Sequence, residues 1–385
     1  MSIIIGIDAS RNRSGGAKAH LIGILSSINP KDFGIDIIHI WSFRGLLDEL
    51  PDKPWLVKHN PPELESSLPI QLSWQALKLK KEVKNARCDI LFTTDASTVC
   101  RFSPMVVMSQ DMLSYEPGIM DYFGYGYERV RLLAILYLQN LAFRHASGVI
   151  FLTNYAAKVI QSSCGKLPNV SKIPHGVGSN FQSIIPENIW PYSCEQPIRA
   201  IYISNTDMYK HQWNVVKAIK ILRDNGFNIQ LRLVGGGHGK AQARLEEQIQ
   251  LSDPERFFVR QDEFVPQHTL PKLLAQSDLF IFASSCENMP VTLIEAMASG
   301  LPIACSNRGP MPEILEDGGV YFNPEKPSSI ANAIEDLIVN PKKRETYAKR
   351  AKELSQQYSW ERCAKETFQF IEKIAKKNRK KISSF

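Results

Sequence analysis

The chain lacks several features that would assign it to a class at once. Among its 385 residues there is no run of about 18 apolar residues, so no transmembrane helix is expected. The opening residues, "MSIIIGIDAS", lack the basic segment and the longer apolar stretch of a secretory signal. The seven cysteines include no CxxC pair and no metal-ligand spacing. These absences favour a cytoplasmic protein with reduced thiols and no disulfide framework.

Charge is also low and unevenly placed. The formal net charge is +7 at pH 7, and six basic residues lie within 373–381. Because the remainder is nearly balanced, a nucleic-acid-binding surface is not expected. The end of the chain, 377–385, is expected to be a basic tail. Such a tail either solubilises the protein or docks it reversibly on the inner face of an anionic membrane.

Short apolar runs alternate with helical patterns through the first half of the chain. Continuous apolar runs of this kind are typical of buried parallel strands, and the alternation predicts an α/β domain covered on both faces of its sheet. The 127–146 helix is interpreted as a core helix, with a membrane-lying helix as the alternative. Strands are expected near 2–8, 33–40, 88–94, 104–111 and 147–153, and helices near 17–28, 68–86 and 127–146.

The pattern then begins again after a segment rich in proline and polar residues. We expect a first domain over 1–181, a linker over 182–197 and a second α/β domain over 198–359. A helix near 360–376 is expected to pack back on the first domain. Two such domains joined by one linker suggest a shared ligand at the carboxyl ends of their strands. Strands of the second domain are expected at 198–204, 227–237, 256–261, 278–284, 302–306 and 319–323, with closing helices at 326–339 and 341–356.

The stretch "CENMPVTLIEAMASG" (286–300) follows one of these strands and supplies the candidate site. Pro290 suits the first position of a helix, which Gly300 would end. Glu287 would lie in the loop before this helix, and Glu295 inside it. Two carboxylates around a helix N-terminus suit a ligand with diols at both ends and phosphate between them, the layout of a nucleotide sugar. Ordinary helix-end and surface charges are the alternative interpretation.

The longer segment "ENMPVTLIEAMASGLPIACSNRGPMPEILEDGG" (287–319) is similar to the signature of glycosyltransferase family 4. "IPHGV" (173–177), "LRLVGGG" (231–237) and "YSWERCAKE" (358–366) resemble further segments of that family. The resemblance therefore covers nearly the whole chain. It implies two Rossmann-like doubly wound parallel-sheet domains facing across a cleft, the GT-B architecture, and a retaining transfer of a hexose from a nucleotide-diphosphate sugar.

The resemblance also implies roles for particular residues. Glu287 would hold hydroxyls of the donor sugar, and Glu295 the ribose diol. Lys210 matches a family lysine that neutralises the diphosphate, whereas Asn205 stands where the family has an arginine. A solvated lysine at a helix start is the alternative for Lys210. The expected donor-binding residues are Gly15, Gly16, Asn205, Lys210, Glu287, Asn288, Met289, Pro290, Val291, Thr292 and Glu295; Glu287 and Lys210 are also expected to be catalytic.

Two departures and one absence bear on the chemistry. In "VVMSQDMLSYEP" (106–117), Gln110 replaces a histidine that many relatives have, while Asp111 remains as an expected acceptor or sugar contact. For His175 and His211, a structural or orienting role is expected rather than proton transfer. No Asp-x-Asp occurs in the sequence, so activity without a metal or other cofactor is expected.

Other functions remain open alongside a transferase. A dehydrogenase is disfavoured because no GxGxxG follows a predicted strand. A sugar-nucleotide epimerase or hydrolase, or a catalytically silent scaffold of the same fold, stays as the alternative. The donor is expected to be GDP- or UDP-linked. The acceptor is expected to be a glycan or polyprenyl-linked lipid of bacterial surface polysaccharide.

Overall fold

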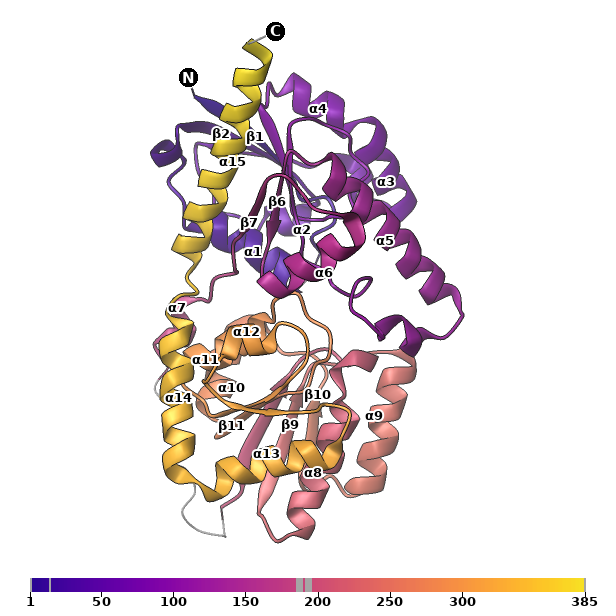
Figure 1. The fold of residues 1–385 in the computed structure, drawn as a ribbon, viewed down its shortest axis with the longest axis vertical. Coiled ribbons are helices and arrows are strands. Elements are labelled where there is room, and N and C mark those ends of the chain that lie inside the picture. Colours follow the sequence, from indigo (N-terminus) through magenta and orange to yellow (C-terminus); the bar gives the residue numbers. More distant parts are fainter. Residues whose placement is uncertain (1, 14, 185–189, 191–195, 384–385) are drawn as a thin grey trace. The chain divides into compact units, whose positions relative to one another are not determined.

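The computed structural model describes residues 2–13, 15–184, 190 and 196–383 (Figure 1). The chain forms two compact units. The first combines Met1–Gly176 with Ser359–Phe385, and the second is Val177–Tyr358. The division falls after residue 176 rather than after 181. Most of the expected linker, 182–197, lies outside the described residues.

The first unit is built on a seven-stranded parallel sheet with the order β3-β2-β1-β4-β5-β6-β7. Its inner strands β4, β5 and β6 bury every residue, as expected for a sheet covered on both faces. The strands are β1 (Ile3–Asp8), β2 (Ile35–Trp41), β3 (Leu56–His59), β4 (Ile90–Thr93), β5 (Met105–Met108), β6 (Gly148–Phe151) and β7 (Val170–Lys172).

Two edge strands and one helix break of this unit were not predicted from the sequence. The edge strands β3 and β7 are only four and three residues long, too short to show a periodicity. The expected single helix over 68–86 is divided at Lys78 into two helices. The helices are α1 (Gly15–Ser26), α2 (Arg44–Leu47), α3 (Leu68–Leu77), α4 (Leu79–Asn85), α5 (Tyr127–His145), α6 (Asn154–Cys164) and α15 (Trp360–Ser383), with 3-10 turns η1 (Pro30–Phe33), η2 (Pro62–Glu65) and η3 (Ile119–Phe123).

Helix α15 packs against α1 of the same unit, so the end of the chain belongs to the first unit (Figure 1). The ring of Trp360 lies 2.3 Å from the position of a Cβ at Gly23, so only glycine fits there. The helix continues to Ser383 instead of ending near 376. The stretch expected to be a tail is therefore helical through 383, since it contains no proline or glycine to stop the helix.

Helix α5 is less buried than a core helix. Its exposed side includes several large apolar side chains, so only one stripe of the helix contacts the unit, and the expectation of a buried core helix is wrong. Within the described chain, no helix combines the length and the apolar character needed to cross a membrane. The buried residues of α5 are Leu132, Gln139, Ala142 and Phe143, and its large exposed apolar residues are Tyr127, Val130, Leu133 and Tyr137.

The second unit repeats the plan with six parallel strands in the order β10-β9-β8-β11-β12-β13. The strands are β8 (Ile198–Ile203), β9 (Ile229–Val234), β10 (Val259–Asp262), β11 (Leu279–Phe282), β12 (Ile303–Ser306) and β13 (Val320–Phe322). The helices are α7 (Ser179–Gln182), α8 (Gln212–Asp224), α9 (Gly239–Ser252), α10 (Leu270–Ala275), α11 (Val291–Ala298), α12 (Met311–Leu315), α13 (Pro327–Val339) and α14 (Pro341–Ser355), with η4 (Met208–Lys210) and η5 (Gln267–Thr269). Both sheets are thus doubly wound, and the predicted α/β class is confirmed.

Candidate functional site

The strand order of the second sheet by itself indicates where a ligand would bind. Successive strands β8, β9 and β10 run to one edge, and β11, β12 and β13 run to the other. The order therefore reverses between β8 and β11, which are direct neighbours. Ligands of open parallel sheets bind at such a reversal, beyond the carboxyl ends of the strands. The loops that follow β8 and β11 contain Lys210 and Glu287, respectively.

Lys210 and Glu287 form an ion pair at this reversal. The Lys210 ammonium contacts Oε1 of Glu287, and Lys210 is only 7% exposed. Turn η4 fixes the lysine, because its backbone N–H donates to the Asp207 carbonyl at 3.0 Å and the Tyr202 hydroxyl donates to the Lys210 carbonyl at 2.9 Å. A pair this buried is costly to break, since either partner alone would be an uncompensated charge. A ligand with its own charges and hydroxyls can replace this ion pair with contacts to Lys210 and to Glu287.

His211, the residue after Lys210, joins the two loops. It has a left-handed backbone with φ of 50°, and its Nε2 lies 2.9 Å from the Ser285 hydroxyl. The Ser285 backbone N–H donates to the Tyr209 carbonyl at 2.8 Å. Burial lowers the pKa of His211 to about 4, so the ring is neutral at physiological pH. A neutral ring at this position holds the loops together and carries no charge toward a ligand.

Glu295 is the most unusual group of the site. It lies inside α11, where it is 3% exposed. Burial raises its pKa from 4.5 to about 8, and within the described part of the chain no hydrogen bond or cation offsets this effect. A buried carboxyl without a partner costs free energy that a hydroxyl donor from a ligand would recover. The helix around it begins at Val291 with Pro290 as its N-cap, one residue later than predicted, and ends before Gly300 at φ of 73°.

The glycine run after β9 brings a third loop against the one that contains Lys210. A Cβ on Gly235 would meet the Ser204 carbonyl oxygen at 2.3 Å, and one on Gly237 would meet the Thr206 carbonyl oxygen at 2.4 Å. Thr206 also donates its N–H to the Gly236 carbonyl at 2.9 Å. The sequence showed this run only through resemblance, because the contact joins residues from different strands.

The other donor-site candidates of the second unit lie around these groups. Asn205 is exposed at the end of β8, so its amide faces solvent. Asn288 and Met289 are buried in the loop after β11, whereas Val291 and Thr292 in the first turn of α11 are half-buried. The structure thus gathers the predicted residues of the second unit at one end of one sheet.

The candidates of the first unit also follow its strand ends. Gly15 has φ of 64° and open space at its Cβ position, and Gly16 follows it at the start of α1. Asp111 lies in the loop after β5, is exposed, and accepts the Leu113 backbone N–H at 2.9 Å. Gln110, which replaces the family histidine, donates to the Met108 sulfur at 3.2 Å.

The first unit also contains a buried polar network that sequence reasoning missed. Asp8, at the end of β1, accepts hydrogen bonds from the Ser10 hydroxyl at 2.7 Å and the Gln75 amide at 2.6 Å. Burial is the largest influence on Asp8 and raises its pKa. Nearby, the Asn12 amide donates to the Thr94 hydroxyl at 2.6 Å. The only sequence signal was Asp8 at the end of the first apolar run, because Asp8 and Gln75 are 67 residues apart in sequence and Asn12 and Thr94 are 82 residues apart.

His175 lies in a buried cluster of rings in the first unit. Its Nδ1 lies 3.0 Å from Nδ1 of His20, and the two rings pack beside Trp360 in the first unit. Burial lowers the pKa of His175 to about 4. In the described residues there is also no group of three or more His, Cys, Asp or Glu side chains able to hold a metal ion.

Comparison with known proteins identifies the part of the chain that carries this site. Residues 188–354 match the family described as glycosyl transferases group 1. This segment is therefore similar to a group 1 glycosyltransferase domain. It contains Lys210, Glu287 and Glu295. The chain is also 26% identical over 168 residues to O-antigen chain mannosyltransferase B of Escherichia coli, a match that covers 44% of each protein. The chain thus spans less than half the length of the curated relatives it matches.

Solved structures similar to the whole chain extend the likeness from this segment to both units. Sucrose-phosphate synthase from Thermosynechococcus elongatus is 16% identical, with a TM-score of 0.74 over 100% of both chains. Anabaena HepE in complex with UDP-glucose is 20% identical, with a TM-score of 0.68 over 100% of both chains. At these identities the likeness establishes the fold, which is the two-domain GT-B type predicted from the sequence.

Proposed function

We propose that this protein is a retaining glycosyltransferase that moves a hexose from a GDP- or UDP-linked donor to a glycan or polyprenyl-linked acceptor. The observation that carries the proposal is the buried carboxyl of Glu295, which has no partner among the described residues and lies in the same unit as the Lys210–Glu287 ion pair. A nucleotide sugar offers a ribose diol, a diphosphate and sugar hydroxyls, which complement these three groups in turn.

Each group has a distinct task in this proposal. Glu295 accepts hydrogen bonds from the ribose hydroxyls, and Glu287 from hydroxyls of the transferred sugar. Lys210 neutralises the charge that develops on the leaving diphosphate, which lowers the barrier because that charge is greatest in the transition state. The bond from the anomeric carbon to the diphosphate oxygen breaks, and the acceptor oxygen bonds to that carbon. The leaving phosphate accepts the acceptor's proton, so neither a protein nucleophile nor a metal is required.

The ion pair indicates how the site is stabilised before a donor binds. Without ligand, Lys210 and Glu287 satisfy each other and keep two buried charges compensated. A donor would exchange this single contact for one to phosphate and one to sugar hydroxyls. Binding therefore does not have to create a charged site from an apolar one.

The comparisons support the class of substrates. HepE was solved with UDP-glucose, and the Escherichia coli relative is named for building the O-antigen chain. We therefore propose a role in bacterial surface polysaccharide synthesis. Its acceptor-binding groups would come from the first unit, with Asp111 as a candidate.

We also propose reversible docking on the anionic inner face of the cytoplasmic membrane. The basic residues at the end of the chain contribute less to this proposal than the sequence indicates, because Lys377 donates to Asn169 and Arg379 pairs with Asp89. Helix α5 instead exposes Tyr127 and Tyr137 at 77% and 66% beside its arginines. Apolar side chains with flanking cations are typical of interfacial helices.

Liposome flotation tests the docking. Binding should require anionic lipid, weaken with salt, and fall in a Tyr127→Ser/Tyr137→Ser variant more than in a Lys377→Gln variant. Equal flotation on neutral and anionic vesicles, or none on either, would contradict it.

The function itself is tested by incubating the purified protein with a panel of GDP- and UDP-sugars, with and without glycan or lipid-linked acceptors. Transfer that retains the anomeric configuration and depends on Lys210 would support the proposal. Donor turnover to free sugar regardless of acceptor would favour a hydrolase, and interconversion of two nucleotide sugars would favour an epimerase. Neither binding nor turnover of any donor would favour a scaffold.

A further inference from the structure

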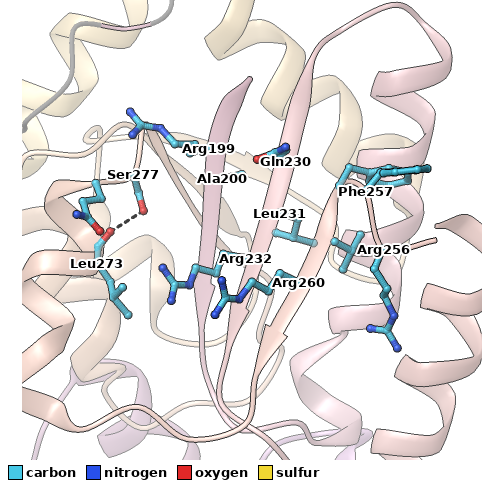
Figure 2. Close-up of a pocket in the computed structure, with 13 residues that line it drawn as sticks. Arg199, Ala200, Gln230, Leu231, Arg232, Arg256, Phe257, Arg260, Leu273 and Ser277 are labelled. Atoms are coloured by element: carbon cyan, nitrogen blue, oxygen red, sulfur yellow. Dashed lines mark hydrogen bonds between the residues drawn. The ribbon is translucent and has the colours of Figure 1, made fainter. Parts of the chain in front are cut away.

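A second basic site lies in the second unit, toward the amino ends of its strands and away from the loops of Lys210 and Glu287. A cavity of about 450 Å³ opens there between strands β8, β9 and β10 and the end of α10 (Figure 2). Its size falls within the range of small-molecule sites, roughly 300–1,000 Å³. Four arginines line it: Arg199, Arg232, Arg256 and Arg260.

The strand register places three of these arginines on one face of the sheet. Arg260 of β10 is aligned with Arg232 of β9, and Arg199 of β8 is aligned with Gln230, two residues before Arg232. Side chains two residues apart point to the same face of a strand. Figure 2 shows the guanidinium groups of Arg232 and Arg260 next to each other. Like charges in adjacent positions repel, so this pair costs free energy unless an anion lies against it.

A single carboxylate, that of Asp262, compensates only part of the positive charge of this pair. Asp262 receives Nε of Arg232 at 2.6 Å through Oδ2 and Nε of Arg260 at 2.9 Å through Oδ1. Within the described residues, the terminal Nη amines of these two arginines have no further hydrogen-bond partner. Two guanidinium groups therefore keep unused donors beside the same cavity.

The remaining arginines are compensated by other carboxylates. Arg199 makes a two-point contact with Asp278, at 3.0 Å and 2.8 Å, and Arg256 pairs with Glu246. Four guanidinium groups thus face three carboxylates, which leaves one positive charge in excess. The excess belongs to the Arg232–Arg260 pair.

The fold leaves this face open. Helix α10, which precedes β11 beside the cavity, has only six residues, and Ser277 and Leu273 near its end form one wall. Phe257, which is 71% exposed, lies on the opposite side of the cavity. A parallel sheet is usually covered by apolar packing on both faces. Here the face instead presents arginines, with an aromatic ring available to a ligand's apolar part.

We propose that this cavity binds a phosphate-bearing anion, with Arg232 and Arg260 as its principal ligands. Guanidinium groups bind phosphate through paired, parallel N–H···O contacts, and the free Nη amines of two adjacent arginines provide them. The site is separate from the proposed donor site, so one chain would bind two phosphate-bearing molecules. It does not depend on which donor the enzyme uses.

Pyrophosphate titrated by calorimetry tests the proposal. Because pyrophosphate would also enter the proposed donor site, the titration is done in a Lys210→Gln/Glu287→Gln background, which removes that site's cation and keeps the two side chains mutually neutral. Adding Arg232→Gln and Arg260→Gln should weaken pyrophosphate binding at least tenfold. Adding Arg350→Gln, an ion-paired surface arginine elsewhere in the domain, should leave it unchanged.

A second variant separates binding from folding. Arg260→Lys keeps the charge and loses the planar fork, so binding should weaken by less than in the glutamine pair while thermal unfolding stays unchanged. Vesicles with phosphatidic acid, compared with neutral vesicles, reveal whether the phosphate can belong to a lipid; binding that needs Arg232 and Arg260 supports the proposal in either case. Pyrophosphate and vesicle binding that both persist in the glutamine pair, or fall equally with Arg350→Gln, would overturn it.

Discussion

Replacing Glu295 by glutamine should change how the stability of the protein depends on pH. Burial raises the pKa of this carboxyl from 4.5 to about 8. At about 1.4 kcal/mol per pKa unit, the gap corresponds to roughly 5 kcal/mol at most. The folded protein retains a proton that the unfolded chain releases between these two values. The stability from this group is therefore fully present below pH 4.5 and is lost as the pH rises through 8.

The effect of Glu295 should be measurable between pH 5 and pH 8. From pH 5 to pH 8, Glu295 alone should lower the free energy of unfolding by about 3.5 kcal/mol. Glu295→Gln has no proton to release, so this decrease should disappear from its urea-unfolding curves. Glu345→Gln, at an exposed position of α14, serves as the control and should follow the native protein. Parallel pH profiles for the native protein and Glu295→Gln would refute the reasoning.

The same residue links pH to the proposed ligand. If ribose hydroxyls donate to the ionised carboxylate, nucleoside diphosphate binding must release the proton that the buried group holds. Calorimetry in buffers of different ionisation enthalpy should then show proton release near pH 7 that is absent in Glu295→Gln. The variant should also bind about 1–3 kcal/mol more weakly. Equal affinity together with an unchanged proton count would remove Glu295 from the donor site.

Three further outcomes are expected. Lys210→Met and Glu287→Gln should each lower transfer at least tenfold and destabilise the fold by up to about 3–5 kcal/mol. The double variant should be more stable than the sum of the two single effects predicts, and additive effects in chemical denaturation would show that the ion pair is not coupled. Transfer should persist in EDTA, and activity that returns only with added Mg²⁺ or Mn²⁺ would contradict metal independence. Gly235→Ala should lower the melting temperature, because its Cβ would meet the Ser204 carbonyl and its φ is 119°, and a calorimetric scan that matches the native protein would show that the loops can separate.

The sequence by itself determined the α/β class, the doubly wound architecture and the position of most strands. Apolar runs such as those of Ile3–Asp8 and Leu279–Phe282 can be recognised as strands from the sequence alone, because a parallel strand covered on both faces has no polar side. It also determined that Glu287 precedes a helix and that Glu295 lies within it, since proline and glycine bound that helix through local backbone preferences.

Only the tertiary structure decided how the site residues act on one another. The contact between Lys210 and Glu287 joins loops 77 residues apart, and no local pattern encodes it. The burial of Glu295 and the resulting rise in its pKa depend on neighbours from other elements. The exposed face of α5 and the adjacent arginines of β9 and β10 also follow from packing and strand register. Local sequence sets backbone preference, whereas burial, charge pairing and pKa depend on which distant residues the fold brings together.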